Sequence, residues 1–141
     1  MPSAIIVEDE VLASERLRVL LEECQVVLLK TFHHAQPALD WLSVHEVDIV
    51  FADIGLPEMN GLEFVERIKC VAKKQPHVIF TTAYEEHALR AFELAAADYL
   101  LKPIKLARLQ AALDRVGEKD EENADSFTHF KVFNRDRMVE I

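Results

Sequence analysis

The feature that most constrains this fold is a regular alternation between short apolar runs and stretches with helical spacing. The runs are almost continuously hydrophobic, which is typical of strands that are buried on both faces. In the other stretches apolar residues recur every three or four positions, as Leu17, Leu20 and Leu21 do. Strands that alternate with helices predict an α/β fold with a doubly wound, five-stranded parallel sheet and right-handed crossovers. The expected strands are 4–7, 26–32, 47–52, 78–80 and 99–101, and the expected helices are 10–24, 35–44, 62–72, 85–96 and 106–116.

Length and composition narrow the class of protein. The 141 residues, half of them hydrophobic, are enough for one domain with a core of its own and exclude a disordered chain. The net charge of -9 disfavours nucleic acid as a direct partner and favours cations or basic proteins. Cys24 and Cys70 fit no metal-ligand spacing, and no apolar run approaches the roughly 20 residues that span a bilayer. We therefore expect a soluble, cytoplasmic protein with no membrane segment.

The composition changes near the C-terminus and suggests how the chain is divided. Residues 1–116 hold the alternating pattern, whereas 117–126 (GEKDEENADS) are polar and mostly acidic and are expected to be a linker. Residues 127–141 are apolar again in a strand-like pattern around a polar NRDR loop, as in a hairpin. Fifteen residues cannot form their own core. The tail is thus expected either to dock on the main domain or to begin a second domain.

Polar side chains follow four of the five predicted strands. The carboxyl ends of parallel strands lie at one edge of a sheet, where ligands bind. Two carboxylates about 5 Å apart repel by roughly 3 kcal/mol at an effective dielectric constant near 20, so such a cluster favours a cation. Oxygen ligands without histidine or cysteine suit Mg²⁺, and a lysine at the same edge suits an incoming phosphate. The residues are Glu8, Asp9 and Glu10, then Asp53, then Thr81 and Thr82, and finally Lys102.

Four motifs in this order carry a family resemblance: IIVEDE, DIVFADIGLPEMNG, VIFTTA and ADYLLKP. Together they resemble the CheY-like receiver domain of response regulators in two-component signalling, over about residues 4–116. The resemblance implies a flavodoxin-like (βα)5 fold with strand order 2-1-3-4-5.

The same resemblance assigns roles to individual residues. Asp53 would accept a phosphoryl group, assisted by Lys102 and Thr82. Mg²⁺ would be held by Asp9, by Asp53, by the backbone carbonyl of Gly55 and, through water, by Glu8. Two residues depart from the commoner pattern, because Glu8 replaces an aspartate and Gly55 replaces a larger residue. The remaining implied features are a Thr82–Tyr99 switch pair and a cis peptide bond before Pro103.

The implied partners are a cognate histidine kinase and a second copy of the chain. The homodimer would form through helix 85–96, strand 99–101 and the last helix, which carry Glu85, Arg90 and Arg108 among other charges. The segment AFELAAADYLLKPI and the tail also resemble LytTR-type (LytR/AlgR) transcription regulators. DNA would then be bound only by a domain absent from this chain, and the receiver would switch transcription as a phosphoacceptor rather than act as a turnover enzyme.

Three other functions remain open at this point. A phosphohydrolase with an aspartyl nucleophile usually has a second aspartate two residues later, where this chain has Gly55. A flavodoxin-like cofactor protein needs a phosphate loop, and the acidic VEDEVLAS segment would repel a phosphate. A binding module that works without phosphorylation would not need the complete set of Asp9, Asp53, Thr82 and Lys102.

His33 and His34 are adjacent and lack the spacing of a metal-binding pair.

Overall fold

The structure, a computed structural model, describes residues 1–83 and 96–130. Five parallel strands form one sheet in the order β2-β1-β3-β4-β5, which confirms the predicted α/β fold and strand order. The predicted strand positions are confirmed to within two residues at each end. The strands are β1 (Ser3–Val7), β2 (Val27–Phe32), β3 (Ile49–Asp53), β4 (His77–Thr82) and β5 (Asp98–Leu101).

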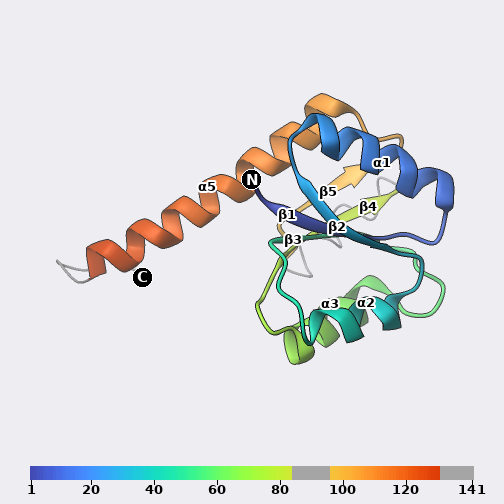
Figure 1. Ribbon diagram of the computed structural model, residues 1–141, viewed down its shortest axis with the longest axis horizontal. Helices are drawn as coiled ribbons and strands as arrows, with labels where there is room; N and C mark the ends of the chain where they lie inside the picture. Colours follow the sequence, from blue (N-terminus) through green and yellow to red (C-terminus); the bar gives the residue numbers. More distant parts are fainter. Residues whose placement is uncertain (84–95, 131–141) are drawn as a thin grey trace. The chain divides into compact units, whose positions relative to one another are not determined.

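Helices cover both faces of the sheet (Figure 1). Helix α1 (Val11–Glu23) lies on one face, and α2 (Ala35–Leu42) and α3 (Gly61–Val71) lie together on the other. Asn60 begins α3, because its side-chain oxygen accepts a hydrogen bond from the Glu63 N–H at 2.8 Å. The predicted helix 85–96 falls almost entirely on 84–95, outside the described residues.

The core follows from the continuous apolar runs. Residues Ile5, Ile6, Val50 and Phe51 of the central strands are fully buried, as expected for strands covered on both faces. The edge strand β2 is different, since its side chains are mostly exposed or half-buried. Burial of β1 and β3 at the centre of the sheet fixes the place where their carboxyl ends, and the acidic residues that follow, come together.

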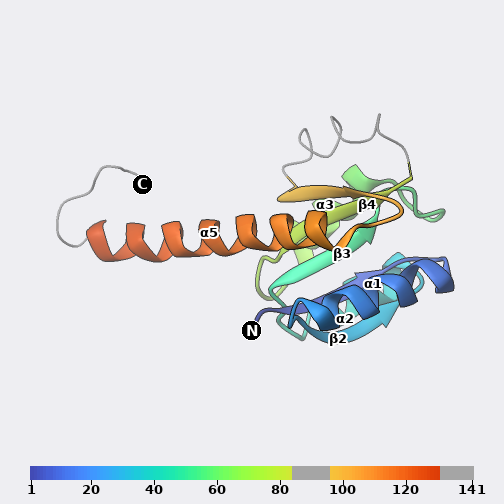
Figure 2. The same ribbon diagram turned by 90° about the horizontal axis from the view of Figure 1, so that it is seen from above.

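The last helix is longer than predicted. Helix α5 runs from Leu106 to Phe130 as one unbroken helix (Figure 2), so the expected helix end at residue 116 is wrong. The expected linker 117–126 is helical, and 127–130 continue the helix instead of starting a strand. The segment has one glycine and no proline, and its Glu, Lys and Ala residues favour helix enough to offset the roughly 1 kcal/mol cost of Gly117. The rest of the expected tail, 131–141, lies outside the described residues.

The chain divides into two compact units, Met1–Leu109 and Gln110–Ile141. The first unit holds the whole sheet, α1 to α3 and the first turn of α5. The second holds the remainder of α5. Within the described residues, no helix has the length and apolar character needed to cross a membrane.

Candidate functional site

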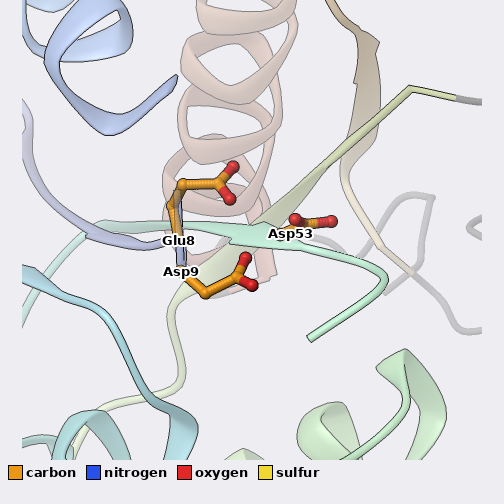
Figure 3. Close-up of side chains that lie close together, drawn as sticks. All are labelled: Glu8, Asp9 and Asp53. Atoms are coloured by element: carbon orange, nitrogen blue, oxygen red, sulfur yellow. The ribbon is translucent and has the colours of Figure 1, made fainter. Parts of the chain in front are cut away.

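Three carboxylates meet at the carboxyl edge of the sheet (Figure 3). Glu8 and Asp9 directly follow β1, and Asp53 is the last residue of the neighbouring strand β3. One carboxylate oxygen from each lies within 4.8 Å of the others. Glu8 is only 4 % exposed, whereas Asp53 is half-buried and Asp9 is exposed. The predicted convergence of these carboxylates is confirmed.

Lys102 joins the cluster from the end of β5. Its Nζ lies 2.6 Å from Glu8 Oε1 and 3.3 Å from Asp53 Oδ2, and Glu10 Oε1 is farther away at 3.8 Å. The side chain of Lys102 is 19 % exposed, so these contacts are poorly screened by solvent. The backbone fixes its position as well, because the Lys102 N–H donates to the Thr82 carbonyl at 2.7 Å.

The electrostatics of the cluster are those of a crowded anionic site. Burial raises the pKa of Glu8 to about 7, although hydrogen bonds from Lys102 and from the Glu10 N–H act in the opposite direction. The nearby Asp53 carboxylate raises the pKa of Glu8 further. Burial lowers the pKa of Lys102, but the Glu8 and Asp53 carboxylates outweigh it and hold that pKa above its usual value. One lysine thus leaves the three carboxylates short of positive charge.

Local hydrogen bonds orient the Asp53 carboxylate. The Gly55 N–H donates to Asp53 Oδ1 at 2.9 Å, and the Ile54 N–H donates to the Thr81 carbonyl at 3.0 Å. Asp53 is in register with Thr81 on β4, so the end of β4 lies beside it. A Cβ atom on Gly55 would lie 3.7 Å from Asp53 Oδ1, which is an ordinary van der Waals contact, so an alanine Cβ would fit here without a clash.

The remaining predicted residues occupy the ends of β4 and β5. Thr81 and Thr82 end β4, and both are buried. Tyr99 lies on β5, half-buried, and packs against the core that α2 and α3 share with the sheet. The Lys102–Pro103 peptide bond is cis, as the resemblance implied. The switch role of Thr82 and Tyr99 and the ligand role of the Gly55 carbonyl remain predictions.

Sequence reasoning missed an ion pair beside Tyr99. The Asp98 side chain is 1 % exposed, and both of its oxygens accept hydrogen bonds from Arg108, at 2.8 and 3.3 Å. Arg108 also donates to the Tyr99 carbonyl at 2.9 Å, and its guanidinium carbon lies 5.5 Å from the centre of the Tyr99 ring. The predicted dimer face includes Arg108, and in the structure this side chain contacts Asp98 and Tyr99 of its own chain. A signal was present in the sequence, since Asp98 directly precedes the apolar run 99–101 and a carboxylate that is buried with such a strand needs a cationic partner.

The cluster fits a hard divalent cation. Its donors are carboxylate oxygens on two adjacent segments, and no histidine or cysteine belongs to the group found among the described residues. Such a set suits Mg²⁺, which is commonly held by one or two carboxylates and several waters.

Comparison with known proteins agrees with the geometry. The family model described as response regulator receiver domain matches residues 4–114. The transcriptional regulatory protein YpdB of Escherichia coli K12 is 36 % identical over 133 residues, which cover 94 % of this chain and 54 % of YpdB. The transcriptional regulatory protein LytR of Staphylococcus aureus N315 is 33 % identical over 142 residues, covering 98 % of this chain and 57 % of LytR.

A solved structure shows the same fold. The response regulatory domain of mrkE from Klebsiella pneumoniae superposes with a TM-score of 0.74 at 36 % identity, and the match covers 85 % of this chain and 98 % of that one. The chain spans about half the length of the curated relatives it matches, and LytR is itself among them, in agreement with the expected LytR/AlgR group. With five strands in the expected order and an acidic cluster at their carboxyl ends, the chain belongs to the response regulator receiver domain family of two-component signalling.

Proposed function

We propose that this receiver accepts a phosphoryl group on Asp53 from the phosphohistidine of a histidine kinase. The observation that carries the proposal is the contact of Lys102 with both Glu8 and Asp53, beside a third carboxylate, at the carboxyl end of β3. This arrangement gives Asp53 a cationic neighbour and leaves negative charge for a metal ion to neutralise. Receiver family membership supports the same reading.

The transfer exchanges one bond to phosphorus for another. An Asp53 carboxylate oxygen attacks the phosphorus in line, the P–N bond to the kinase imidazole breaks, and the imidazole keeps the electron pair. Lys102, 3.3 Å from Asp53 Oδ2, is close enough to pair with the negatively charged oxygens of a phosphoryl group on Asp53. Asp9, Asp53 and the Gly55 carbonyl, with Glu8 acting through water, would hold Mg²⁺, which would supply the remaining positive charge. Hydrolysis of the acyl phosphate resets Asp53, so the protein acts as a phosphoacceptor and not as a turnover enzyme.

The start of α1 suggests where the kinase docks. Val11 and Leu12 are 62 % and 77 % exposed and come directly after the acidic residues. A cavity of about 500 Å³ opens beside Leu12 and is also lined by Lys102 and Ile104. An apolar surface beside Lys102, which contacts Asp53, suits a partner that must bring its own phosphorylated side chain to that site.

The proposed output is transcriptional. Phosphate on Asp53 would draw the Thr82 hydroxyl inward and allow the Tyr99 ring to follow, which would bias dimerisation through 85–96, β5 and α5. The two relatives are named as transcriptional regulatory proteins, which supports a DNA-binding domain elsewhere in the parent protein. Neither Cys24 nor Cys70 is in a disulfide bond, which fits the reducing cytoplasm where such a regulator would work.

A second candidate function is a receiver that binds its partner without phosphorylation. It is less well supported, because a module of that kind has no need of Lys102 held between two carboxylates. A phosphohydrolase is also less well supported, since Gly55 occupies the place of the second aspartate.

Phosphorylation is tested by incubation with acetyl phosphate and Mg²⁺, followed by intact-mass measurement. We expect one phosphoryl group on the natural chain and none on Asp53→Asn. Asp9→Asn removes a proposed ligand, so it should abolish Mg²⁺ binding while slightly raising thermal stability without Mg²⁺, because a neighbouring negative charge is gone. Glu46→Gln is the matched control, since this exposed residue precedes β3 at the opposite edge of the sheet. A mass shift that persists in Asp53→Asn would refute the assignment.

A further inference from the structure

The loop between β2 and α2 is hydrogen-bonded to both acidic loops of the site. On one side, His33 Nδ1 lies 2.9 Å from the backbone carbonyl oxygen of Glu8. A carbonyl oxygen can only accept a hydrogen bond, so Nδ1 carries the proton and donates. The Glu8 N–H in turn donates to the Phe32 carbonyl at 2.9 Å. The backbone N–H of Glu8 is thus fixed by Phe32, the last residue of β2, and its carbonyl by His33, the residue after it.

On the other side, the loop holds Glu58, which lies between β3 and α3. The Ala35 N–H donates to Glu58 Oε1 at 3.0 Å, and His34 Nδ1 lies 3.4 Å from Glu58 Oε2. His34 takes the N-cap position of α2, yet in the described part of the chain its side chain makes no capping bond to that helix. Glu58, 23 residues along from Ala35, supplies the acceptor that the first turn of α2 needs.

Glu58 fixes the middle of a loop whose two ends are held by other bonds. The Ile54 N–H bond to Thr81 holds the beginning, and the Asn60 cap on α3 holds the end. Gly55, which bonds to the Asp53 carboxylate, lies three residues before Glu58. A change at Glu58 therefore reaches Asp53 through a short piece of backbone that is otherwise fixed at its two ends.

We infer that the segment His33–His34–Ala35, here called the β2–α2 clasp, sets the separation of the two acidic loops, and that His33 and Glu58 are positioning residues for the carboxylate cluster. The inference rests on the proposed function, because the cluster matters only as a cation and phosphoryl site. Neither residue belongs to the acidic cluster itself. Residues that hold metal ligands in place typically change metal affinity by 10- to 100-fold when they are removed.

The test is an NMR titration of the unphosphorylated chain with Mg²⁺ alone. Glu58→Ala removes the acceptor for the Ala35 N–H, and we expect its Mg²⁺ dissociation constant to rise on the order of 10-fold. Glu58→Gln keeps an oxygen in the same place, so its affinity should stay near that of the natural chain. Before any metal is added, the Gly55 amide signal should shift in Glu58→Ala and remain in place in Glu58→Gln.

Controls separate the clasp from a general effect of charge or stability. Glu46→Ala removes the same charge at the opposite edge of the sheet and should leave both readouts unchanged. His33→Phe keeps a ring without the donor and tests the other half of the clasp by the same titration, even if Glu58→Ala fails to fold. Equal Mg²⁺ affinity and an unmoved Gly55 signal in Glu58→Ala and His33→Phe would overturn the inference. If the natural chain itself shows no Mg²⁺-dependent shifts at Asp9 and Asp53, the proposed function fails instead, and the clasp as a metal-positioning device fails with it.

Discussion

Among single residues, Lys102 offsets part of the cost of burying the acidic cluster when no metal ion is bound. Glu8 is almost completely buried, and Lys102 at 2.6 Å is its nearest cation in the described chain. Burial raises the pKa of Glu8 to about 7, which shows that the lysine only partly offsets the cost of removing this carboxylate from water. The pair with Lys102 therefore stabilises the ionised form of Glu8 by less than burial destabilises it.

Removal of Lys102 should therefore destabilise the protein through Glu8. For Lys102→Met without Mg²⁺, we expect a loss of about 1–3 kcal/mol in the free energy of unfolding, because a buried carboxylate loses its strongest bond. The double variant Glu8→Gln/Lys102→Met should recover part of that loss. Urea unfolding followed by the fluorescence of Trp41, the single tryptophan, measures both. Additive effects of the two changes would contradict direct coupling.

At the scale of elements, the Asp98–Arg108 pair fastens β5 to the first turn of α5. The buried Asp98 is the first residue of β5, Arg108 lies in the first turn of α5, and the guanidinium also donates to the backbone carbonyl of Tyr99. The largest effect on the pKa of Arg108 is the hydrogen bond to Asp98, which raises it. The register between the two elements is thereby tied to the strand that carries the proposed switch residue.

Loss of the Arg108 guanidinium should be costly. Arg108→Met deprives a buried carboxylate of its cation, so we expect stability to fall by about 3 kcal/mol. Arg18→Met is the matched control, because Arg18 pairs with Glu15 and Glu22 on the exposed face of α1, where such pairs contribute under about 1 kcal/mol. Thermal unfolding distinguishes the two variants. Equal losses of stability in Arg108→Met and Arg18→Met would show that the pair with Asp98 contributes no more than an exposed ion pair.

This pair also changes how the proposed dimer should be tested. Arg108→Glu would repel Asp98 within the same chain, so a lost dimer could reflect a damaged β5. Lys105 is exposed and lies just before α5, which makes Lys105→Glu the cleaner substitution. With a beryllofluoride phosphate mimic, sedimentation velocity should show a dimer for the natural chain and a weaker one for Lys105→Glu. A natural chain that stays monomeric with and without the mimic would refute the dimer.

At the scale of the whole molecule, Asp48 links three distant segments at the amino edge of the sheet. Its side chain accepts hydrogen bonds from the Ser3 N–H and from Lys74, each at 2.9 Å, and its carbonyl accepts from the His77 N–H. Burial tends to raise the pKa of Asp48, but the bonds from Lys74 and Ser3 outweigh it and hold the pKa below its usual value. The ionised form is therefore favoured by the folded state.

Because the folded state lowers the pKa of Asp48, this residue should make the protein less stable at acid pH. The stabilisation by Asp48 is present above the unfolded pKa of about 3.9 and is lost as the pH falls through the lower, folded value. Asp48→Asn should thus be less stable than the natural chain at pH 7, by less than about 1 kcal/mol because the side chain is about a third exposed, and the difference should shrink as the pH is lowered toward about 2. Urea unfolding at both pH values checks this. A difference that grows toward acid pH would contradict it.

The C-terminal segment offers a further test at this scale. The family match ends at residue 114, and Gly117 and Glu118 on α5 are exposed. Deletion of 117–141 should leave phosphorylation of Asp53 and the main thermal transition intact. Intact-mass measurement and calorimetry follow the two properties. Loss of folding would show that the first 116 residues are not sufficient as a domain.

Much of this protein could be predicted from sequence because its strands are continuous apolar runs. Runs such as AIIV and VDIVFA, set between stretches with helical spacing, favour central strands of a parallel sheet, and the polar residues that follow such strands lie at one edge. Glu8, Asp9, Asp53 and Lys102 could be assigned to one site in this way. The end of α5 could not be predicted, because the polar composition of 117–126 is compatible both with a linker and with an exposed helix.

Which polar groups bond to one another depends on the tertiary structure and could not be predicted. Glu58 and Ala35 are 23 residues apart, and Ser3 and Asp48 are 45 apart, so no local pattern connects them. Their contacts depend on how loops turn after the strands end, and loops carry no periodicity from which a partner could be read. The sequence was thus sufficient to predict the sheet and the edge that carries the acidic cluster. The packing of the loops decided that Arg108 binds Asp98 and that Glu58 caps α2, because a buried or partly buried polar group takes whichever partner the fold brings within reach.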